Sequence, residues 1–201
     1  MLYRIMFEPK ALCKLIWALL TPRRNVFQRG NLFFYNCLSV EEIIREAKKD
    51  DTLLVIGFSY CQKAKFCPFG RFNDSCSYDP RNPACQVCSI GSVLSRRSSK
   101  YKVIIIPTFM YIAEYFYRIR KENPRKRLLF IITACELSLK MFGEYVNVWE
   151  LKGVGVRLVG RICNTMKAFR LAEEGIKPGV TELDQDGFEA LVDALLNIED
   201  Q

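Results

Sequence analysis

The sequence contains no histidine. This absence excludes a Ser-His-Asp or Cys-His catalytic arrangement, an imidazole general base and a histidine metal ligand. The chain also lacks the GxxxxGK[ST] loop that cradles nucleotide phosphates. The glycines of KGVGVRLVG (152–160) stand before and within an expected strand, whereas a dinucleotide fingerprint needs them between a strand and a helix. We therefore assign these glycines to a tight turn and to close packing.

Long uninterrupted hydrophobic runs are also absent. No window reaches the length of a membrane-spanning helix, and the amino terminus has Glu8 and Lys14 where a signal peptide would have its apolar residues. We therefore expect a cytoplasmic protein whose thiols stay reduced. With 201 residues, of which 50% are hydrophobic and 26% charged, the chain is long enough for one globular domain with its own core.

Negative charge is scarce in the middle of the chain. Residues 61–130 carry fourteen Lys and Arg against four Asp and Glu, whereas residues 161–201 carry four against nine. A basic face can attract nucleic acid, a phosphate ligand or an acidic protein. The basic residues are scattered, however, and no nucleic-acid-binding signature accompanies them. We therefore favour a solvated surface over nucleic-acid binding.

Residues 1–50 are expected to form a helical segment. In the expected helix 9–20, apolar residues recur at helical spacing. Such a helix could rest on a membrane surface, but docking on its own domain is favoured. A second helix, 40–50, follows Ser39, with Glu42 in capping-box position. We expect the whole segment to pack on the domain that follows.

The rest of the chain, 51–201, is predicted to form a single α/β domain. Continuous apolar runs alternate with stretches of helical pattern, which is typical of parallel strands buried on both faces. We predict a three-layer α/β/α sandwich with a mostly parallel sheet of at least four strands and a long cysteine-rich loop after the first strand. The expected strands are 52–60, 102–108, 127–134 and 154–162, and the expected helices include 109–123 and 136–145.

What the chain does have is cysteine: nine residues, an odd number that excludes complete pairing within one chain. In a reducing compartment such a density of thiols indicates metal or redox chemistry. Cys61, Cys135 and Cys163 directly follow expected strands, and the carboxyl ends of parallel strands face a common crevice. We therefore predict that these three thiols meet at one edge of the sheet.

Four more cysteines stand in one loop, within the segment 61–92. A structureless connection of that length is unusual inside a compact domain unless something other than a hydrophobic core holds it. The last two form a CxxC, whose spacing lets both sulfurs face one metal atom. We therefore predict that a metal folds this loop and that its ligands are Cys67, Cys76, Cys85 and Cys88.

Spacing does not separate zinc from an iron-sulfur cluster, because both accept four thiolates. Seven thiols in one sector of the fold exceed one tetrahedral zinc site, so an iron-sulfur cluster is favoured and zinc is the alternative. We predict a four-iron (4Fe-4S) cluster on Cys61, Cys135 and Cys163, with one iron open. In a rival arrangement Cys61 joins the loop thiols and the other two form an open dithiol. The polar groups expected to bind cluster sulfurs or an anion are Thr108, Thr133, Asn164 and Thr165.

Cys135 is followed directly by Glu136. A carboxylate next to a thiol disfavours the thiolate and raises the pKa of the thiol. The sequence therefore predicts a poorly reactive thiol at this position if no metal binds it.

Several stretches resemble a known family. CPFGRFNDSC, NPACQVCSIG, IITACELSL and GVGVRLVGRICNT are similar to the conserved-cysteine family called domain of unknown function 116, from bacteria and archaea. The resemblance covers roughly residues 55–170, and its most specific parts are the cysteine loop and the pair TACE and CNT. Membership implies a metal or iron-sulfur protein without an established reaction. Members often carry amino-terminal membrane spans, which are not carried over to this chain.

Three functions remain as alternatives. The favoured one is an iron-sulfur protein in electron transfer or cluster-dependent redox chemistry, with an unidentified redox partner protein or small-molecule substrate. The second is a zinc-organised binding module whose basic surface takes nucleic acid or an acidic partner. The third is a metal-free thiol redox enzyme or sulfur carrier in which Cys135 and Cys163 cycle.

Overall fold

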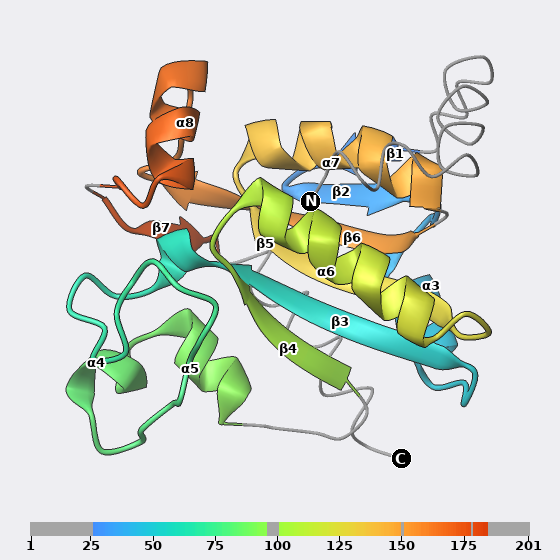
Figure 1. Cartoon of the computed structure of the whole chain (residues 1–201), viewed down its shortest axis with the longest axis horizontal. Helices are drawn as coiled ribbons and strands as arrows, with labels where there is room; N and C mark the ends of the chain where they lie inside the picture. Colours follow the sequence, from blue (N-terminus) through green and yellow to red (C-terminus); the bar gives the residue numbers. More distant parts are fainter. Residues whose placement is uncertain (1–25, 96–100, 150, 178, 185–201) are drawn as a thin grey trace.

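The computed structural model describes residues 26–95, 101–149, 151–177 and 179–184. These residues form a mixed seven-stranded sheet with helices around it (Figure 1). The strands are β1 (Val26–Arg29), β2 (Leu32–Tyr35), β3 (Thr52–Ser59), β4 (Tyr101–Ile106), β5 (Arg127–Ala134), β6 (Lys152–Gly160) and β7 (Thr181–Leu183). The helices are α3 (Val40–Ala47), α4 (Pro83–Gln86), α5 (Ser89–Leu94), α6 (Phe109–Glu122), α7 (Glu136–Trp149) and α8 (Met166–Glu173), with the 3-10 helix η1 (Tyr60–Gln62).

Four consecutive strands of the sheet run parallel in the order β6-β5-β3-β4, with β4 at the edge. Helices lie in the three connections between them, as the crossover between parallel strands requires. The β1–β2 hairpin joins the other side of β6 in antiparallel pairing, and β7 pairs with the last residues of the same strand. The predicted α/β class with a largely parallel sheet is therefore confirmed.

Helices α3 and α6 are among those that begin at side-chain caps. Ser39 Oγ accepts from the backbone N–H of Glu42 at 3.3 Å, and Glu42 Oε2 accepts from the N–H of Leu38 at 2.8 Å. These bonds confirm the expected start of α3. At the start of α6, Thr108 Oγ1 accepts from the N–H of Tyr111 at 3.0 Å.

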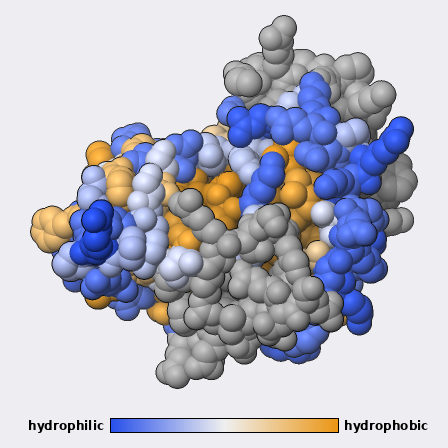
Figure 2. Space-filling view, turned by 90° about the horizontal axis from the view of Figure 1, so that it is seen from below, coloured by the Kyte–Doolittle hydropathy of each residue, from blue (hydrophilic) through white to orange (hydrophobic). Residues whose placement is uncertain are grey.

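Apolar side chains of the central strands form two buried clusters. In β3, Ile56 belongs to one cluster and Val55 to the other, because successive residues of a strand point to opposite faces. The first cluster includes Ile43 of α3 and Ile90 of α5, and the second includes Phe142 of α7. Helices α6 and α7 lie across the face turned to the viewer in Figure 1. On the face seen from below, hydrophobic residues gather in the middle, between hydrophilic ones (Figure 2).

Two glycines of β6 let its neighbours approach closely. A Cβ on Gly153 would lie 2.1 Å from the carbonyl oxygen of Phe130 in β5, and one on Gly155 would lie 2.6 Å from Leu139 Cδ2 in α7. Any side chain at these positions would push β5 or α7 away from β6. The close-packing role predicted for these glycines is therefore confirmed.

The description of residues 1–50 as helical is wrong for residues 26–35, which form the β1–β2 hairpin of the main sheet. Gly30 sits in the turn with φ of 58°, a conformation that glycine adopts without a steric penalty. Helix α3 is shorter than the expected 40–50. The expected helix 9–20, together with its docking or membrane contact, lies outside the described residues.

Strand ends differ slightly from those expected. β6 ends at Gly160, so Cys163 follows it by three residues, and Cys61 lies within η1 after β3. The short helices α4 and α5 interrupt the connection that was expected to be one long loop. In the part of the chain that the structure describes, no helix combines the length and hydrophobicity that crossing a membrane demands.

Candidate functional site: a thiol pocket at the sheet edge

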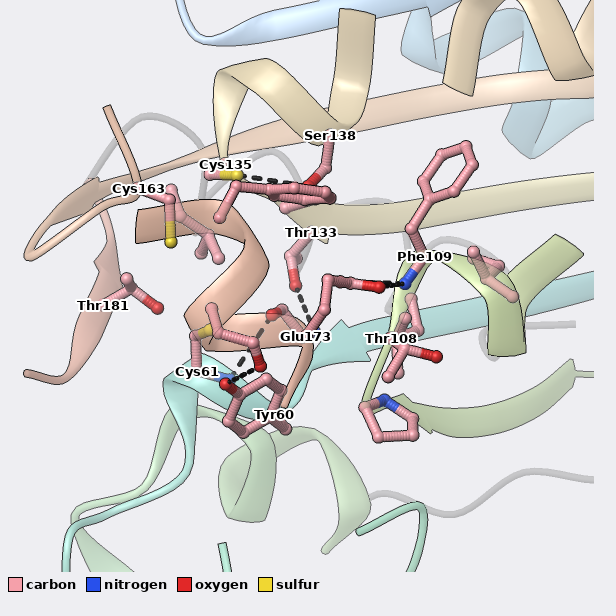
Figure 3. A pocket seen from close by; sticks show the side chains of 18 of the residues that line it. Tyr60, Cys61, Thr108, Phe109, Thr133, Cys135, Ser138, Cys163, Glu173 and Thr181 are labelled. Atoms are coloured by element: carbon pink, nitrogen blue, oxygen red, sulfur yellow. Dashed lines mark hydrogen bonds between the residues drawn. The ribbon is translucent and has the colours of Figure 1, made fainter. Parts of the chain in front are cut away.

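The three thiols that were predicted to meet line one pocket at the carboxyl edge of the parallel strands. Cys61 follows β3, Cys135 follows β5 and Cys163 follows β6, and these strands are neighbours in the sheet. In Figure 3 the cysteines lie along one side of the pocket, and Thr108 and Phe109 lie on the opposite side. The remaining wall is largely apolar and includes Ile106, Pro107, Ile132, Leu158 and Phe169.

Cys135 lies directly before α7, at its amino-terminal end. Its Sγ lies 3.1 Å from the Ser138 hydroxyl, and Cys163 lines the same pocket. The interaction with Cys163 is the largest of the effects that lower the pKa of Cys135 to about 6, against the opposing effect of burial. These surroundings favour the thiolate, which is the nucleophilic form of cysteine.

Glu136 does not act against this thiolate. Its carboxylate forms ion pairs with Lys140 at 2.6 Å and with Arg157 at 3.0 Å. The hydrogen bonds from these cations hold the pKa of Glu136 below its ordinary value. The expectation that Glu136 makes Cys135 a poorly reactive thiol is therefore wrong, because the glutamate charge is compensated while hydrogen-bond donors surround the sulfur.

Cys163 is buried, with 6% of its surface exposed. Its interaction with Cys135, followed by burial, raises the pKa of Cys163. The Cys163 thiol donates to the carbonyl of Ala168 at 3.6 Å, and Lys177 Nζ donates to Cys163 Sγ at 3.1 Å. A lysine cation therefore lies beside the second thiol of the pocket.

Cys61 lies at the same pocket with a different environment. Burial is the main cause that raises the pKa of this thiol. The carbonyl of Cys61 accepts from Arg71 at 3.1 Å, and Arg71 also donates to the carbonyls of Lys177 at 2.7 Å and of Gly179. One guanidinium thus ties the cysteine-rich segment to the chain that carries Lys177.

Helix α8 and the turn after it supply residues that the sequence analysis missed. Phe169 packs with Cys163 in a small separate cluster. Glu173 accepts from the backbone N–H of Phe109 at 2.8 and 3.0 Å, and burial raises the pKa of its carboxyl. Neither Glu173 nor Lys177 stands at a spacing that links it to a cysteine motif, so no signal in the sequence could have selected them.

The four polar residues predicted at this edge divide into two pairs. Thr108 and Thr133 line the pocket. Thr108 Oγ1 caps α6, and Thr133 Oγ1 accepts from the N–H of Ser59 at 3.2 Å. Asn164 and Thr165 are exposed and do not line the pocket, and Thr165 instead caps α8. The structure therefore brings together only the first pair with the thiols.

The strand-end thiols do not fit a cluster in this arrangement. Lys177 donates a hydrogen bond to Cys163 Sγ. A metal ion that bound this sulfur would have to compete with the lysine. Across the described residues, no three Cys, Asp or Glu side chains converge as ligands of one ion. The pocket has a free volume of about 60 Å³, enough for a few water molecules. We therefore derive no step through a metal at Cys61, Cys135 and Cys163.

The cysteine-rich segment is organised around a buried lysine. Lys63 is 1% exposed, and its Nζ donates to the carbonyls of Gly70 at 3.0 Å and Ser75 at 2.6 Å and to the side chain of Asn73. Burial lowers the pKa of Lys63. A buried ammonium normally requires a negative partner, yet these three partners are neutral.

Three of the four loop thiols lie near this lysine. A negative charge on any of them would raise the pKa of Lys63, and two of them act in the same way on the third, Cys76. The fourth thiol, Cys85, is buried in α4. The predicted loop ligands therefore share one region, although they are not assembled around one ion in this structure. The three thiols near the lysine are Cys67, Cys76 and Cys88.

No protein-family model, no curated protein and no solved structure matches this chain. The resemblance to domain of unknown function 116 therefore stays a prediction. The function has to be argued from the chemistry of the pocket and of the cysteine-rich segment.

Proposed function

We propose that this protein is a thiol oxidoreductase in which Cys135 is the nucleophile and Cys163 the resolving thiol. The observation that carries the proposal is that both thiols line one pocket, where Cys135 Sγ lies 3.1 Å from the Ser138 hydroxyl and Cys163 Sγ accepts from Lys177 Nζ at 3.1 Å. Cys135 also accepts from the backbone at the start of α7. Helix amino termini and nearby cations are the environments that activate cysteine nucleophiles.

The reaction is a two-electron reduction. The Cys135 thiolate attacks an electrophilic atom of the substrate, the substrate bond breaks, and the leaving group takes the proton of Cys163. The Cys163 thiolate, stabilised by Lys177 at 3.1 Å, then attacks Cys135 Sγ and displaces the atom that Cys135 had captured. The substrate leaves reduced by two electrons, and the two cysteines end as a disulfide.

The reduced full-length protein should form one disulfide first when it is treated with a substoichiometric amount of diamide, a small thiol oxidant. Peptide mapping by mass spectrometry should identify this bond as Cys135–Cys163, and dithiothreitol should reverse it. A first disulfide within the loop, or none at all, would contradict the proposal.

Cys37 provides the matched control for that experiment. It is buried, donates to the carbonyl of Gly153 at 3.1 Å, and has a pKa raised by burial to about 11. C37S should therefore form the Cys135–Cys163 disulfide as the unmodified protein does, whereas C163S should form no disulfide at Cys135.

An iron-sulfur protein is the second candidate, and the observation that favours it is Lys63. Four thiolates around a dication carry a net charge of −2, which would supply the negative partner that this buried ammonium lacks. The ligands would be the loop thiols, and a cluster there would add one-electron transfer, whereas zinc would only organise the segment. The four proposed ligands are Cys67, Cys76, Cys85 and Cys88.

Metal analysis and a visible spectrum of anaerobically purified protein test this second candidate. Iron with sulfide and a brown colour support a cluster, and a colourless protein with zinc supports the binding-module alternative. Single serine variants of the four loop thiols should each lower the metal content, and C37S should not. Full metal content in all four variants would contradict loop ligation.

The proposal extends to the layers of the fold, the location of the protein and its partners. The two buried clusters, with α3 and α5 on one and α6 and α7 on the other, support a three-layer α/β/α sandwich. Free thiols at the reacting site support a cytoplasmic location. A redox partner protein must restore the dithiol after each turnover, and nucleic acid is not proposed as a partner.

A further inference from the structure

The free space at the thiol pair is small. The pocket offers about 60 Å³, which holds a few water molecules but no peptide, nucleotide or sugar. The part of a substrate that reaches Cys135 must therefore be a compact electrophilic group.

One polar atom of the pocket has no partner. Thr181 is 2% exposed, and its hydroxyl makes no hydrogen bond within the described chain. It lines the same pocket, and its oxygen is turned toward the thiols (Figure 3). Buried hydroxyls are nearly always hydrogen-bonded, so this one points to a ligand with a polar atom of its own.

A second donor lies beside Cys163. Lys177 uses one N–H on the sulfur, and an ammonium group carries three. The pocket therefore presents a thiolate, a hydroxyl and an ammonium to one small space. These groups together suit a substrate with two neighbouring oxygen atoms. The thiolate would attack one oxygen, and the hydroxyl and the ammonium would donate hydrogen bonds to the other as it leaves.

We propose that the substrate of the dithiol is a small hydroperoxide; this inference rests on the proposed function of Cys135 and Cys163. The Cys135 thiolate attacks the terminal oxygen of R–O–O–H, the O–O bond breaks, and RO⁻ takes the proton of Cys163 and leaves as ROH. Cys135 becomes a sulfenic acid. Cys163 then attacks Cys135 Sγ, and water leaves as the disulfide forms. In sum, two thiols and ROOH give one disulfide, ROH and water, and a dithiol reductant restores the pair.

Rapid mixing of the reduced full-length protein with hydrogen peroxide tests the inference, with quenching and mass spectrometry to read the state of Cys135. In C163S, dimedone should trap the sulfenic acid at Cys135. The rate at which peroxide oxidises the Cys135 thiolate should be about tenfold higher in the native protein than in the urea-unfolded chain. A tenfold difference corresponds to about 1.4 kcal/mol of transition-state stabilisation. Equal rates would overturn the inference.

Thr181 supplies a sharper variant. T181V removes the hydroxyl at nearly constant volume and should slow the peroxide reaction about fivefold, the effect of one net hydrogen bond. T181S should restore the rate. Alkylation of Cys135 by iodoacetamide, which needs only the thiolate, should be the same in all three proteins and also shows that the variants fold.

The outcomes separate the two claims. If iodoacetamide and diamide react as proposed but T181V is oxidised by peroxide as fast as the unmodified protein, the hydroperoxide inference fails and the thiol oxidoreductase stands. If Cys135 neither alkylates as a thiolate nor pairs with Cys163, the proposed function fails, and the hydroperoxide inference fails with it.

Discussion

The charge on Cys135 depends on its neighbours. The thiol of Cys163 and the backbone N–H and hydroxyl of Ser138 all stabilise its thiolate. Cys37 is the opposite case in the same chain, because it is buried, donates to a carbonyl, and has a pKa raised to about 11. Burial therefore raises the pKa of Cys37, whereas the polar neighbours of Cys135 lower its pKa despite burial.

Removal of the largest stabilising contact should show this directly. C163A deletes the thiol whose interaction with Cys135 is the largest cause that lowers the pKa of Cys135, and this pKa should then rise by about one unit or more. A higher pKa leaves less thiolate at neutral pH, so alkylation of Cys135 should slow. S138A keeps the backbone N–H and should cause a smaller rise. Unchanged alkylation in C163A would contradict the assigned role of Cys163.

The side chain of Lys63 binds three residues of the cysteine-rich segment and should therefore stabilise the fold of this segment. K63M removes the donors to Gly70, Asn73 and Ser75, and proteases should then cleave between residues 64 and 75 more readily. K65M changes an exposed lysine two residues further on and is the matched control. Equal cleavage of K63M and K65M would show that the lysine does not organise this segment.

At the scale of elements, the central part of the fold was predictable. The four parallel strands are continuous apolar runs, and α3 and α6 begin at cap residues that are visible in the sequence. The hairpin β1–β2 was missed because VFQR and LFFY are short and are surrounded by residues without a clear period. Its turn at Gly30 and Asn31 was a usable signal, since two-residue hairpin loops favour such pairs.

The packing of β6 against β5 gives a stability prediction. G153A places a Cβ 2.1 Å from a backbone carbonyl that cannot move without disturbing the sheet. We expect a loss of about 3 kcal/mol or more in the free energy of unfolding, measured by denaturant titration. G143A in α7 is the control, because its Cβ would meet no atom closer than 3.5 Å. It should be neutral or gain up to about 1 kcal/mol in helix stability, and an equal loss in both variants would contradict this packing account.

Only part of the candidate site could be predicted from the sequence, and the reason lies in how the strands pair. Cys61, Cys135 and Cys163 could be placed together because they follow strands that pair. Lys177 lies between α8 and β7, and Thr181 is the first residue of β7. Nothing in the sequence sets how β7 pairs with the end of β6, and that pairing decides where Thr181 points.

At the scale of the whole molecule, the site exists only in the folded chain. Its groups come from β3, β5, β6, α7, α8 and β7, so the segments that supply them span more than half of the sequence. Unfolding should therefore abolish the difference between the cysteines, and all of them should titrate as ordinary thiols. This comparison separates a property of the fold from a property of the local sequence around each cysteine.

The most direct test of the central claim is the rate of alkylation of Cys135 as a function of pH, read at that residue by mass spectrometry in the reduced, full-length, metal-free protein. Lowering the pH through the pKa protonates the thiolate, so the rate should be constant well above the pKa and fall below it. We predict a midpoint at about pH 6. A midpoint near 9, the ordinary value for a cysteine thiol, would contradict the account.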